Sequence, residues 1–128
     1  VQKLNNKQAG LFVDDEGFAY NTTALGSALG YIKWEDIKSL NTVEGLGNSY
    51  LTVEVFNPEA YLNKIKSGFI RKQTRKRIYE SEKHRGILLT ISANGLQDFE
   101  FNELERLFSN KLNDFRKGSQ NNEADNKI

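Results

Sequence analysis

The chain has 128 residues, with 18 Lys and Arg, 17 Asp and Glu, one His, and neither Cys nor Met. A chain of this length buries about two-thirds of its unfolded surface around one core, so a single folded domain is expected. Its hydrophobic fraction of 38% is enough for that core and argues against a disordered chain. The lack of Cys excludes a disulfide framework, a thiolate nucleophile and a Cys-bound zinc.

Both ends of the chain look different from its centre. Residues 1–9 are a polar lead-in with no signal-peptide core, and the absence of an initiator Met indicates a piece excised from a longer protein. No apolar run approaches the ~20 residues that cross a bilayer, so any membrane anchor would lie outside these residues. Residues 118–128 are almost free of apolar groups and predict a disordered tail. The folded domain is therefore expected at residues 10–117.

The first half of the chain has the pattern of strands and turns. Residues 11–13 and 18–21 predict a hairpin around an acidic turn at 14–17, with Gly17 at positive φ. Two Ala-Leu-Gly copies in residues 22–30 predict an exposed loop. An extended segment follows at residues 31–34. Further strands are expected at residues 37–43 and 50–56, separated by a glycine-containing turn at 45–48.

The period of the pattern changes at Asn57-Pro58, which predicts the N-cap and first position of a short helix. Residues 66–85 are strongly charged and are expected to be helical or mobile. The apolar run 87–91 predicts a strand buried on both faces, and Asn94-Gly95 predicts a turn. A helix is expected from Asn102, capped through Glu105, to a stop at Gly118. Its apolar stripe is Leu104, Leu107, Phe108, Leu112 and Phe115.

These elements predict a mainly β, α+β protein. About six or seven short antiparallel strands would form one curled sheet or partly open barrel, because curling removes most of the free strand edges. The C-terminal amphipathic helix would cap the open end, and a basic helical insertion would precede the last strands.

Residues 32–37, Ile-Lys-Trp-Glu-Asp-Ile, resemble a stretch of bacterial pleckstrin-homology-like (PH-like) domains. The order of the surrounding motifs is also similar over residues 10–115: an opening Gly-Leu-Phe-Val-Asp-Asp-Glu-Gly hairpin, then Asn-Pro-Glu, then Ile-Ser-Ala-Asn, then Phe-Asn-Glu-Leu. Together they resemble a family of largely uncharacterised bacterial proteins in which two N-terminal transmembrane helices precede a PH-like domain.

The resemblance implies a curled β-sheet with a C-terminal helix, belonging to a protein of the bacterial inner membrane whose soluble domain faces the cytoplasm. It implies no established activity. A non-enzymatic binding or interaction module is therefore the expected function, with no cofactor.

The charge of the chain is concentrated in residues 64–85, here termed the basic segment. Nine of the 18 Lys and Arg but only two of the 17 Asp and Glu lie there, so this segment carries +7 and the remainder −6. If residues 69–79 are helical, one half of the helix holds Phe69, Ile70, Thr74 and Ile78, and the other holds Arg71, Lys72, Arg75 and Lys76.

This segment has three interpretations. A solvated helix that pairs with the acidic remainder is one. An anionic lipid surface is the second, with cations near headgroups and apolar groups inserted. The third is recognition of another protein, as a scaffold or an immunity-type partner. The predicted binding residues are Arg71, Lys72, Arg75, Lys76, Arg77, Phe69 and Ile70. Nucleic acid is disfavoured, because the cations lie in one segment and few aromatic side chains accompany them.

The remaining chemistry-bearing residues suit structural roles. The acidic turn 14–17 lacks the twelve-residue ligand spacing of a calcium loop, and Glu35 and Asp36 would point to opposite faces of a strand. His84 is the only imidazole and is expected at the surface, while Trp34 is expected as a core anchor. No catalytic residue and no metal ligand is predicted, and an enzyme of unknown class is the weakest alternative.

Overall fold

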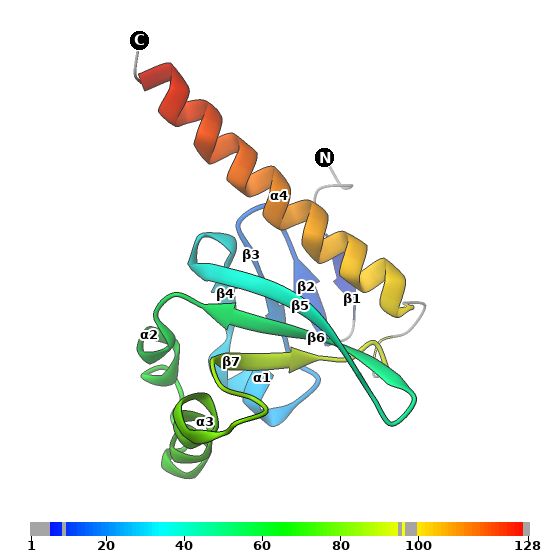
Figure 1. Ribbon diagram of the computed structural model, residues 1–128, viewed down its shortest axis with the longest axis vertical. Coiled ribbons are helices and arrows are strands. Elements are labelled where there is room, and N and C mark those ends of the chain that lie inside the picture. The colour runs from blue at the N-terminus through cyan, green and yellow to red at the C-terminus, as the bar shows by residue number, and fades with distance from the viewer. Residues whose placement is uncertain (1–5, 9, 95, 97–99, 127–128) are drawn as a thin grey trace.

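The computed structural model describes residues 6–8, 10–94, 96 and 100–126 (Figure 1). Its strands form two antiparallel sheets. The first has the order β1 (Asn6–Gln8), β2 (Leu11–Val13), β3 (Gly17–Tyr20) and β4 (Tyr31–Lys33). The second has the order β5 (Ile37–Gly45), β6 (Asn48–Val55) and β7 (Ile87–Ile91). The predicted α+β class is confirmed, with the strands divided between two sheets.

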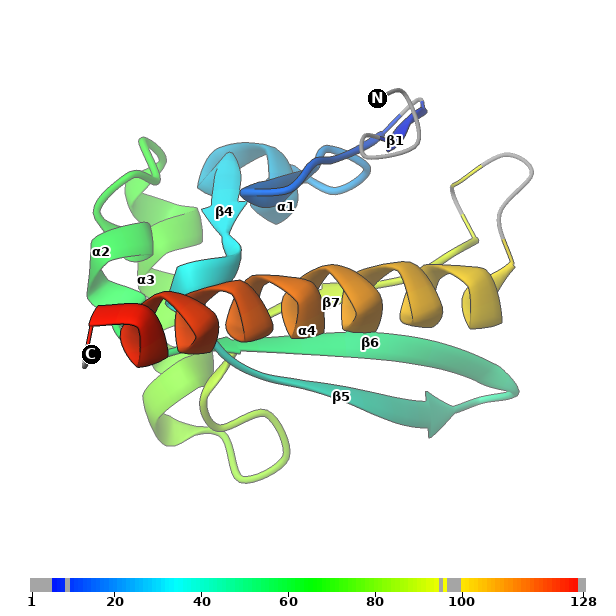
Figure 2. The ribbon, with the colours of Figure 1, turned by 90° about the horizontal axis from the view of Figure 1, so that it is seen from above.

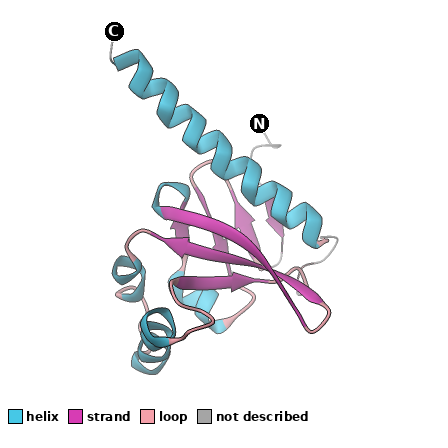
Figure 3. Ribbon diagram, in the orientation of Figure 1, coloured by secondary structure: helices cyan, strands magenta, loops and turns pink. Residues whose placement is uncertain are grey.

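Helices occupy the connections and the C-terminal end (Figure 3). Helix α1 (Ala24–Leu29) joins β3 to β4, and the 3₁₀ turn η2 (Trp34–Asp36) joins the two sheets. Helices α2 (Pro58–Leu62) and α3 (Gly68–Glu80) lie between β6 and β7, so the basic segment is mainly helix α3 and its flanking turns. Helix α4 (Phe101–Asn126) completes the fold.

Helix α4 runs between the β5–β6 hairpin and the four-stranded sheet (Figure 2). The predicted apolar stripe forms its contact face, because Leu104, Phe108 and Leu112 are buried. Phe108 meets Phe18 and Trp34 at ring-centroid distances of 4.7 and 5.5 Å. Trp34 is thus a core anchor, as predicted, and its indole N–H donates to the Asp14 carbonyl at 2.9 Å.

Polar contacts fix α4 to both sheets. Lys111 Nζ pairs with Asp15 Oδ1 at 2.7 Å in the β2–β3 turn, and the Thr42 hydroxyl on β5 donates to the Glu105 carboxylate. The two sheets also meet through the Tyr20 hydroxyl, which donates to the Ser92 carbonyl and accepts from the Ser92 N–H, both at 3.3 Å. Through Lys111 and Glu105, helix α4 is therefore connected to both sheets.

The segment predicted as an exposed loop, residues 22–30, contains helix α1. The Thr23 hydroxyl caps it by accepting from the Gly26 N–H at 3.0 Å, and Gly30 ends it at a φ of 71°. Gly26 packs against β3, since a Cβ there would lie 2.0 Å from the Tyr20 carbonyl oxygen. The prediction of a loop was wrong because Gly26 allows α1 to pack closely against β3, while Thr22, Thr23, Ala24 and Ser27 are exposed as expected.

The acidic turn between β2 and β3 is a structural turn, as expected. The Asp14 carboxylate accepts from the backbone N–H groups of Glu16 and Gly17 at 3.0 and 2.9 Å. Gly17 is not among the residues at positive φ, contrary to the prediction. It is required because a Cβ would lie 2.2 Å from the Ile32 carbonyl oxygen.

The second sheet largely follows the predicted strands. Leu51, Val53 and Val55 are buried, and the turn after β5 has Leu46 and Gly47 at φ values of 53° and 80°. Strand β7 is not buried on both faces throughout, because Thr90 is exposed and Ile87 is half-buried. The predicted turn at Asn94-Gly95 includes residue 95, which lies outside the described residues.

The short helix α2 begins at Pro58, as predicted, but the Asn57 side chain makes no capping hydrogen bond. Glu35 and Asp36 lie in the 3₁₀ turn η2 rather than on a strand. Instead of pairing with Glu35, Asp36 accepts a hydrogen bond from the Tyr61 hydroxyl on α2.

Both ends of α4 differ from the prediction. The helix begins at Phe101, and its capping contact is the Glu103 carboxylate accepting from the Glu100 N–H at 3.2 Å, in place of the expected Asn102–Glu105 pair. Its backbone continues to Asn126, through Gly118 and the predicted disordered tail. One glycine costs a helix only about 1 kcal/mol relative to Ala, which is too little to end it. Strand β1 likewise lies in the predicted polar lead-in.

Candidate functional site

Helix α3 presents one face to the core and leaves the opposite face exposed. The Ser67 hydroxyl caps it by accepting from the Ile70 N–H at 3.2 Å. Ile70, Thr74 and Ile78, spaced four residues apart, face the body of the protein, with Ile78 only 2% exposed. The Thr74 hydroxyl donates to the Ile70 carbonyl at 2.8 Å. Ile70 is therefore a packing residue, although the sequence placed it among the binding residues.

Arg71 and Arg75 are bound within the fold. Arg71 Nη1 donates to the Ile65 carbonyl at 2.6 Å, which closes the turn between α2 and α3. Arg75 forms a two-point contact with the Glu59 carboxylate on α2, at 2.8 and 3.3 Å. The hydrogen bond from Arg75 is the main cause that lowers the Glu59 pKa, and the same bond raises the Arg75 pKa. Tyr79 donates a further hydrogen bond to Glu59 at 3.0 Å.

Arg77 reaches from α3 to the edge of β7. Its Nη1 and Nη2 donate to the carbonyls of Ile87 and Leu88 at 2.6 and 2.9 Å. Burial alone lowers the Arg77 pKa. No carboxylate bonds to this guanidinium within the described part of the chain. Arg77 therefore acts first as a cap for two strand carbonyls.

The exposed face of α3 holds the rest of the predicted binding residues, namely Phe69, Lys72 and Lys76. Phe69 is 70% exposed. Lys72 and Lys76 are also exposed, and neither has a hydrogen-bond or ion-pair partner among the described residues. Spacings of three and four residues place all three on one face of the helix. We call these three residues the α3 outer face.

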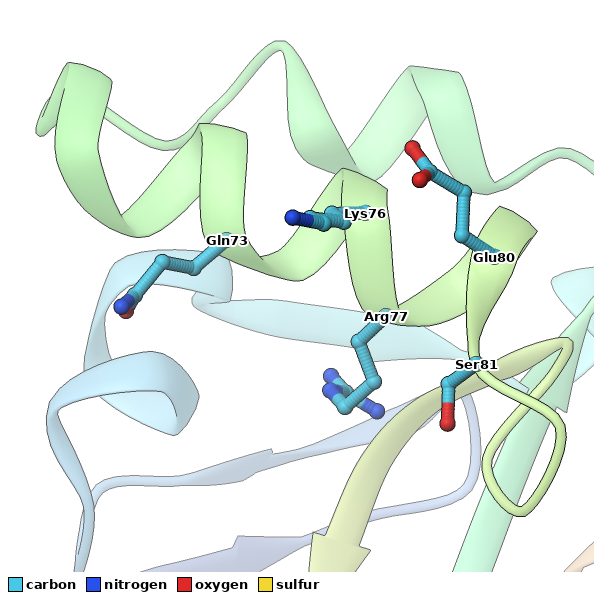
Figure 4. A pocket seen from close by; sticks show the side chains of 5 residues that line it. All are labelled: Gln73, Lys76, Arg77, Glu80 and Ser81. Atoms are coloured by element: carbon cyan, nitrogen blue, oxygen red, sulfur yellow. The ribbon is translucent and has the colours of Figure 1, made fainter.

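An open hollow of about 510 Å³ lies beside this face (Figure 4). Its lining residues are Gln73, Lys76, Arg77, Glu80 and Ser81. Figure 4 shows the Arg77 side chain extending from α3 toward the strands below it. Arg77 also lines two smaller hollows beside α1, one of about 370 Å³ with Leu25 and Ile70, and one of about 290 Å³ with Thr23 and His84. The hollows offer donors and one carboxylate, a set that can bind polar groups.

Two tyrosines whose pKa values are raised occupy structural positions. Burial, followed by the hydrogen bond to Asp14, raises the Tyr31 pKa. Burial, followed by the hydrogen bond to Asp36, raises the Tyr61 pKa. Each tyrosine joins separate elements and stays protonated at neutral pH. His84 is exposed, as predicted, and the described residues contain no group of three or more side chains arranged to hold a metal ion.

The sequence did not identify Glu59 as the partner of Arg75 or the carbonyls of β7 as partners of Arg77. Glu59 is sixteen residues from Arg75 and its only signal was the acidic position in the first turn of α2. A backbone carbonyl has no sequence signal. Which cations remain free was therefore not predictable from the pattern of charges.

In comparisons with family models, with curated proteins and with solved structures, nothing matched the chain. Among the described helices, none combines the length and the apolar character needed to cross a bilayer. What the fold defines is the class: an α+β domain of two antiparallel sheets with a C-terminal helix between them.

Proposed function

We propose that this chain is a PH-like binding module of a membrane-anchored bacterial protein, and that the α3 outer face contacts anionic lipid headgroups. In this proposal the protein belongs to the inner membrane, the domain faces the cytoplasm, and it acts by binding rather than by catalysis. The division of strands into sheets of four and three, followed by a long C-terminal helix, supports the PH-like assignment.

The observation that carries the proposal is the position of Phe69 beside two unpaired lysines. The Phe69 side chain is 70% exposed, so much of its apolar surface is in contact with water. Insertion at a lipid interface would remove that surface from water and is therefore favourable. Lys72 and Lys76 would then lie at headgroup level, where each cation contributes about 1 kcal/mol. Such a contact is weak by itself and suits a domain that an anchor already holds near the bilayer.

The contact that we propose involves only part of the basic segment. Arg71, Arg75 and Arg77 hold the fold together, so the contact rests on fewer charges than the +7 of the segment suggests. Lys66, in the turn before α3, is also exposed.

Vesicle sedimentation tests the proposal. The chain should bind vesicles of phosphatidylcholine with phosphatidylglycerol at low salt, and bind less at high salt or to phosphatidylcholine alone. Lys72→Glu with Lys76→Glu should weaken binding by roughly tenfold or more. Lys33→Glu with Lys38→Glu, two exposed lysines on β4 and β5, is the matched charge control.

For the apolar contact, Phe69→Ala should weaken binding while Phe56→Ala, at a residue 67% exposed elsewhere, should not. Equal and negligible sedimentation in all lipid and salt conditions would overturn the proposal. Equal losses in the α3 variants and their controls would show that the contact is not on this face.

Recognition of an acidic protein is the second candidate function, favoured by the hollow that both Lys76 and Arg77 line. It predicts that soluble polyglutamate binds without lipid. Lys76→Glu should abolish that binding, whereas Phe69→Ala should leave it unchanged. Vesicle binding with no effect of polyglutamate would instead favour the lipid contact.

A further inference from the structure

The three-stranded sheet has a second exposed surface, on the side that faces away from the core. This surface is separate from the α3 outer face. The register pairs Val43 with Tyr50 across β5 and β6, and Thr52 with Thr90 across β6 and β7. Directly paired residues of antiparallel strands share a face, and here that face is opposite to the one that holds the buried Leu51 and Val53. Val43 is 47% exposed, so no other element of the described chain covers it fully.

A hollow of about 440 Å³ lies on this face. Its lining residues are Val43, Tyr50, Thr52, Lys83, His84, Ile87 and Thr90. The volume falls within the range of pockets that hold small ligands. Val43, Tyr50 and Ile87 give it apolar and aromatic surface, and Lys83 and His84 line it from the 81–86 turn. The lining contains no carboxylate.

The turn that supplies these two polar side chains is held in place by backbone contacts. The His84 N–H donates to the Ser81 hydroxyl at 3.2 Å, and the Ile87 N–H donates to the His84 carbonyl at 3.1 Å. The Gly86 N–H donates to the Ile78 carbonyl at 2.9 Å, with Gly86 at a φ of 84°. The polar side of the hollow is therefore fixed relative to α3 and β7.

Glu54 on β6 lies on the same face of the sheet, but its carboxylate contacts residues that do not line the hollow. It accepts from the Ser39 hydroxyl at 3.1 Å, and its Oε1 would lie 2.7 Å from a Cβ at Gly86. Glu54 thus lies close to Gly86 in the 81–86 turn and is not among the residues that line the hollow. The charge that faces the hollow comes from Lys83.

From the apolar floor and the cationic side we infer that this hollow binds a free amphiphile with an alkyl or aryl body and one anionic headgroup, such as a medium-chain fatty acid. The body lies on Val43, Tyr50 and Ile87. The carboxylate lies at the Lys83 ammonium and the His84 ring, within reach of the Thr90 hydroxyl. Charge complementarity selects an anion, and the apolar floor selects a ligand with a chain.

Isothermal titration with decanoate at monomeric concentrations tests the inference on the intact chain. Decanoate should bind, acetate should not, and decyltrimethylammonium, with the same tail and the opposite charge, should bind at least tenfold more weakly. Affinity should rise by up to about fourfold for each added methylene, as full burial of a CH₂ group predicts.

Two variants locate the site. Val43→Glu places a carboxylate in the hollow at an exposed strand position, and Lys83→Glu reverses the charge at its side. Both should reduce decanoate affinity by at least tenfold, whereas Lys72→Glu on α3 should leave it unchanged. The thermal unfolding midpoint of each variant checks that the fold is kept.

Absence of decanoate binding would overturn the inference, as would equal binding of the two decyl amphiphiles or equal affinity in Val43→Glu. If the parent chain did not bind decanoate and Val43→Glu lost vesicle binding, this face would contact the bilayer. That result would overturn the inference that the hollow binds a free amphiphile. Phe69 and Lys72 do not line the hollow. A negative result with decanoate would therefore not affect the vesicle test of the α3 outer face.

Discussion

Arg77 and Arg116 cap the two opposite edge strands of the three-stranded sheet. Arg77 on α3 donates to the Ile87 and Leu88 carbonyls of β7, and Arg116 on α4 donates to the Ile37 and Lys38 carbonyls of β5. The register places both contacts at the same end of the sheet. Edge carbonyls without partners invite pairing with other chains, so the two guanidinium groups close this end of the sheet.

The first prediction concerns the cap on β7. Arg77→Met removes two charge-assisted hydrogen bonds and leaves the Ile87 and Leu88 carbonyls without their donor. We expect the free energy of unfolding to fall by about 2–4 kcal/mol, as measured by urea denaturation. Lys76→Met, at the adjacent exposed position, should change it by less than about 0.5 kcal/mol. Equal effects of the two substitutions would contradict the structural role of Arg77.

The second prediction concerns the aromatic core. Phe108→Ala leaves a cavity between Phe18 and Trp34, so the free energy of unfolding should fall by about 3–5 kcal/mol. Phe69→Ala removes an exposed ring of the same chemistry and should cost less than about 0.5 kcal/mol. Trp34 fluorescence during denaturation follows both variants. A small loss in Phe108→Ala would mean that α4 is not packed between the sheets.

The third prediction concerns two glycines in helices. Gly26→Ala forces a Cβ to 2.0 Å from the Tyr20 carbonyl oxygen, so α1 must shift and the protein should lose about 1–3 kcal/mol or more. Gly118→Ala meets no atom within 4 Å and should stabilise α4 by up to about 1 kcal/mol. Opposite signs in thermal unfolding are expected. Destabilisation by Gly118→Ala would contradict a continuous helix at that position.

The fourth prediction concerns acid. Burial acts to raise the Asp14 pKa, but hydrogen bonds from Tyr31 and from the Glu16 and Gly17 N–H groups outweigh it and lower that pKa below its ordinary value of 3.8. A carboxylate with a lowered pKa stabilises the fold above that ordinary value, and the contribution is lost as the pH falls through the folded-state pKa.

Stability should therefore decline as the solution is acidified below about pH 4. Asp14→Asn should reduce the steepness of that decline. Glu35→Gln, at an exposed carboxylate, is the control and should leave it unchanged. An identical pH profile for Asp14→Asn and the parent chain, from denaturation at several pH values, would contradict the prediction.

The sequence determined the elements whose pattern is local. Alternation in residues 50–56 predicted β6, and the stripe from Leu104 to Phe115 predicted the helix that enters the core. The residues of α1 carried a capping Thr23 and a terminal Gly30, yet two short Ala-Leu-Gly copies could equally suit a loop. Only the carbonyl of Tyr20, packed against Gly26, decided between them.

Tertiary structure alone decided which charges are free. Lys76 and Arg77 are adjacent in the sequence, and both read as parts of one basic patch of charge +7. A helix turns by about 100° per residue, so the docking of α3 sends Arg77 to β7 and leaves Lys76 exposed. The near-zero net charge of the chain and its basic segment were visible in the sequence. The sequence did not show how few cations of the basic segment remain unpaired on the α3 outer face. The partners of Arg71, Arg75 and Arg77 lie on other elements and include backbone carbonyls.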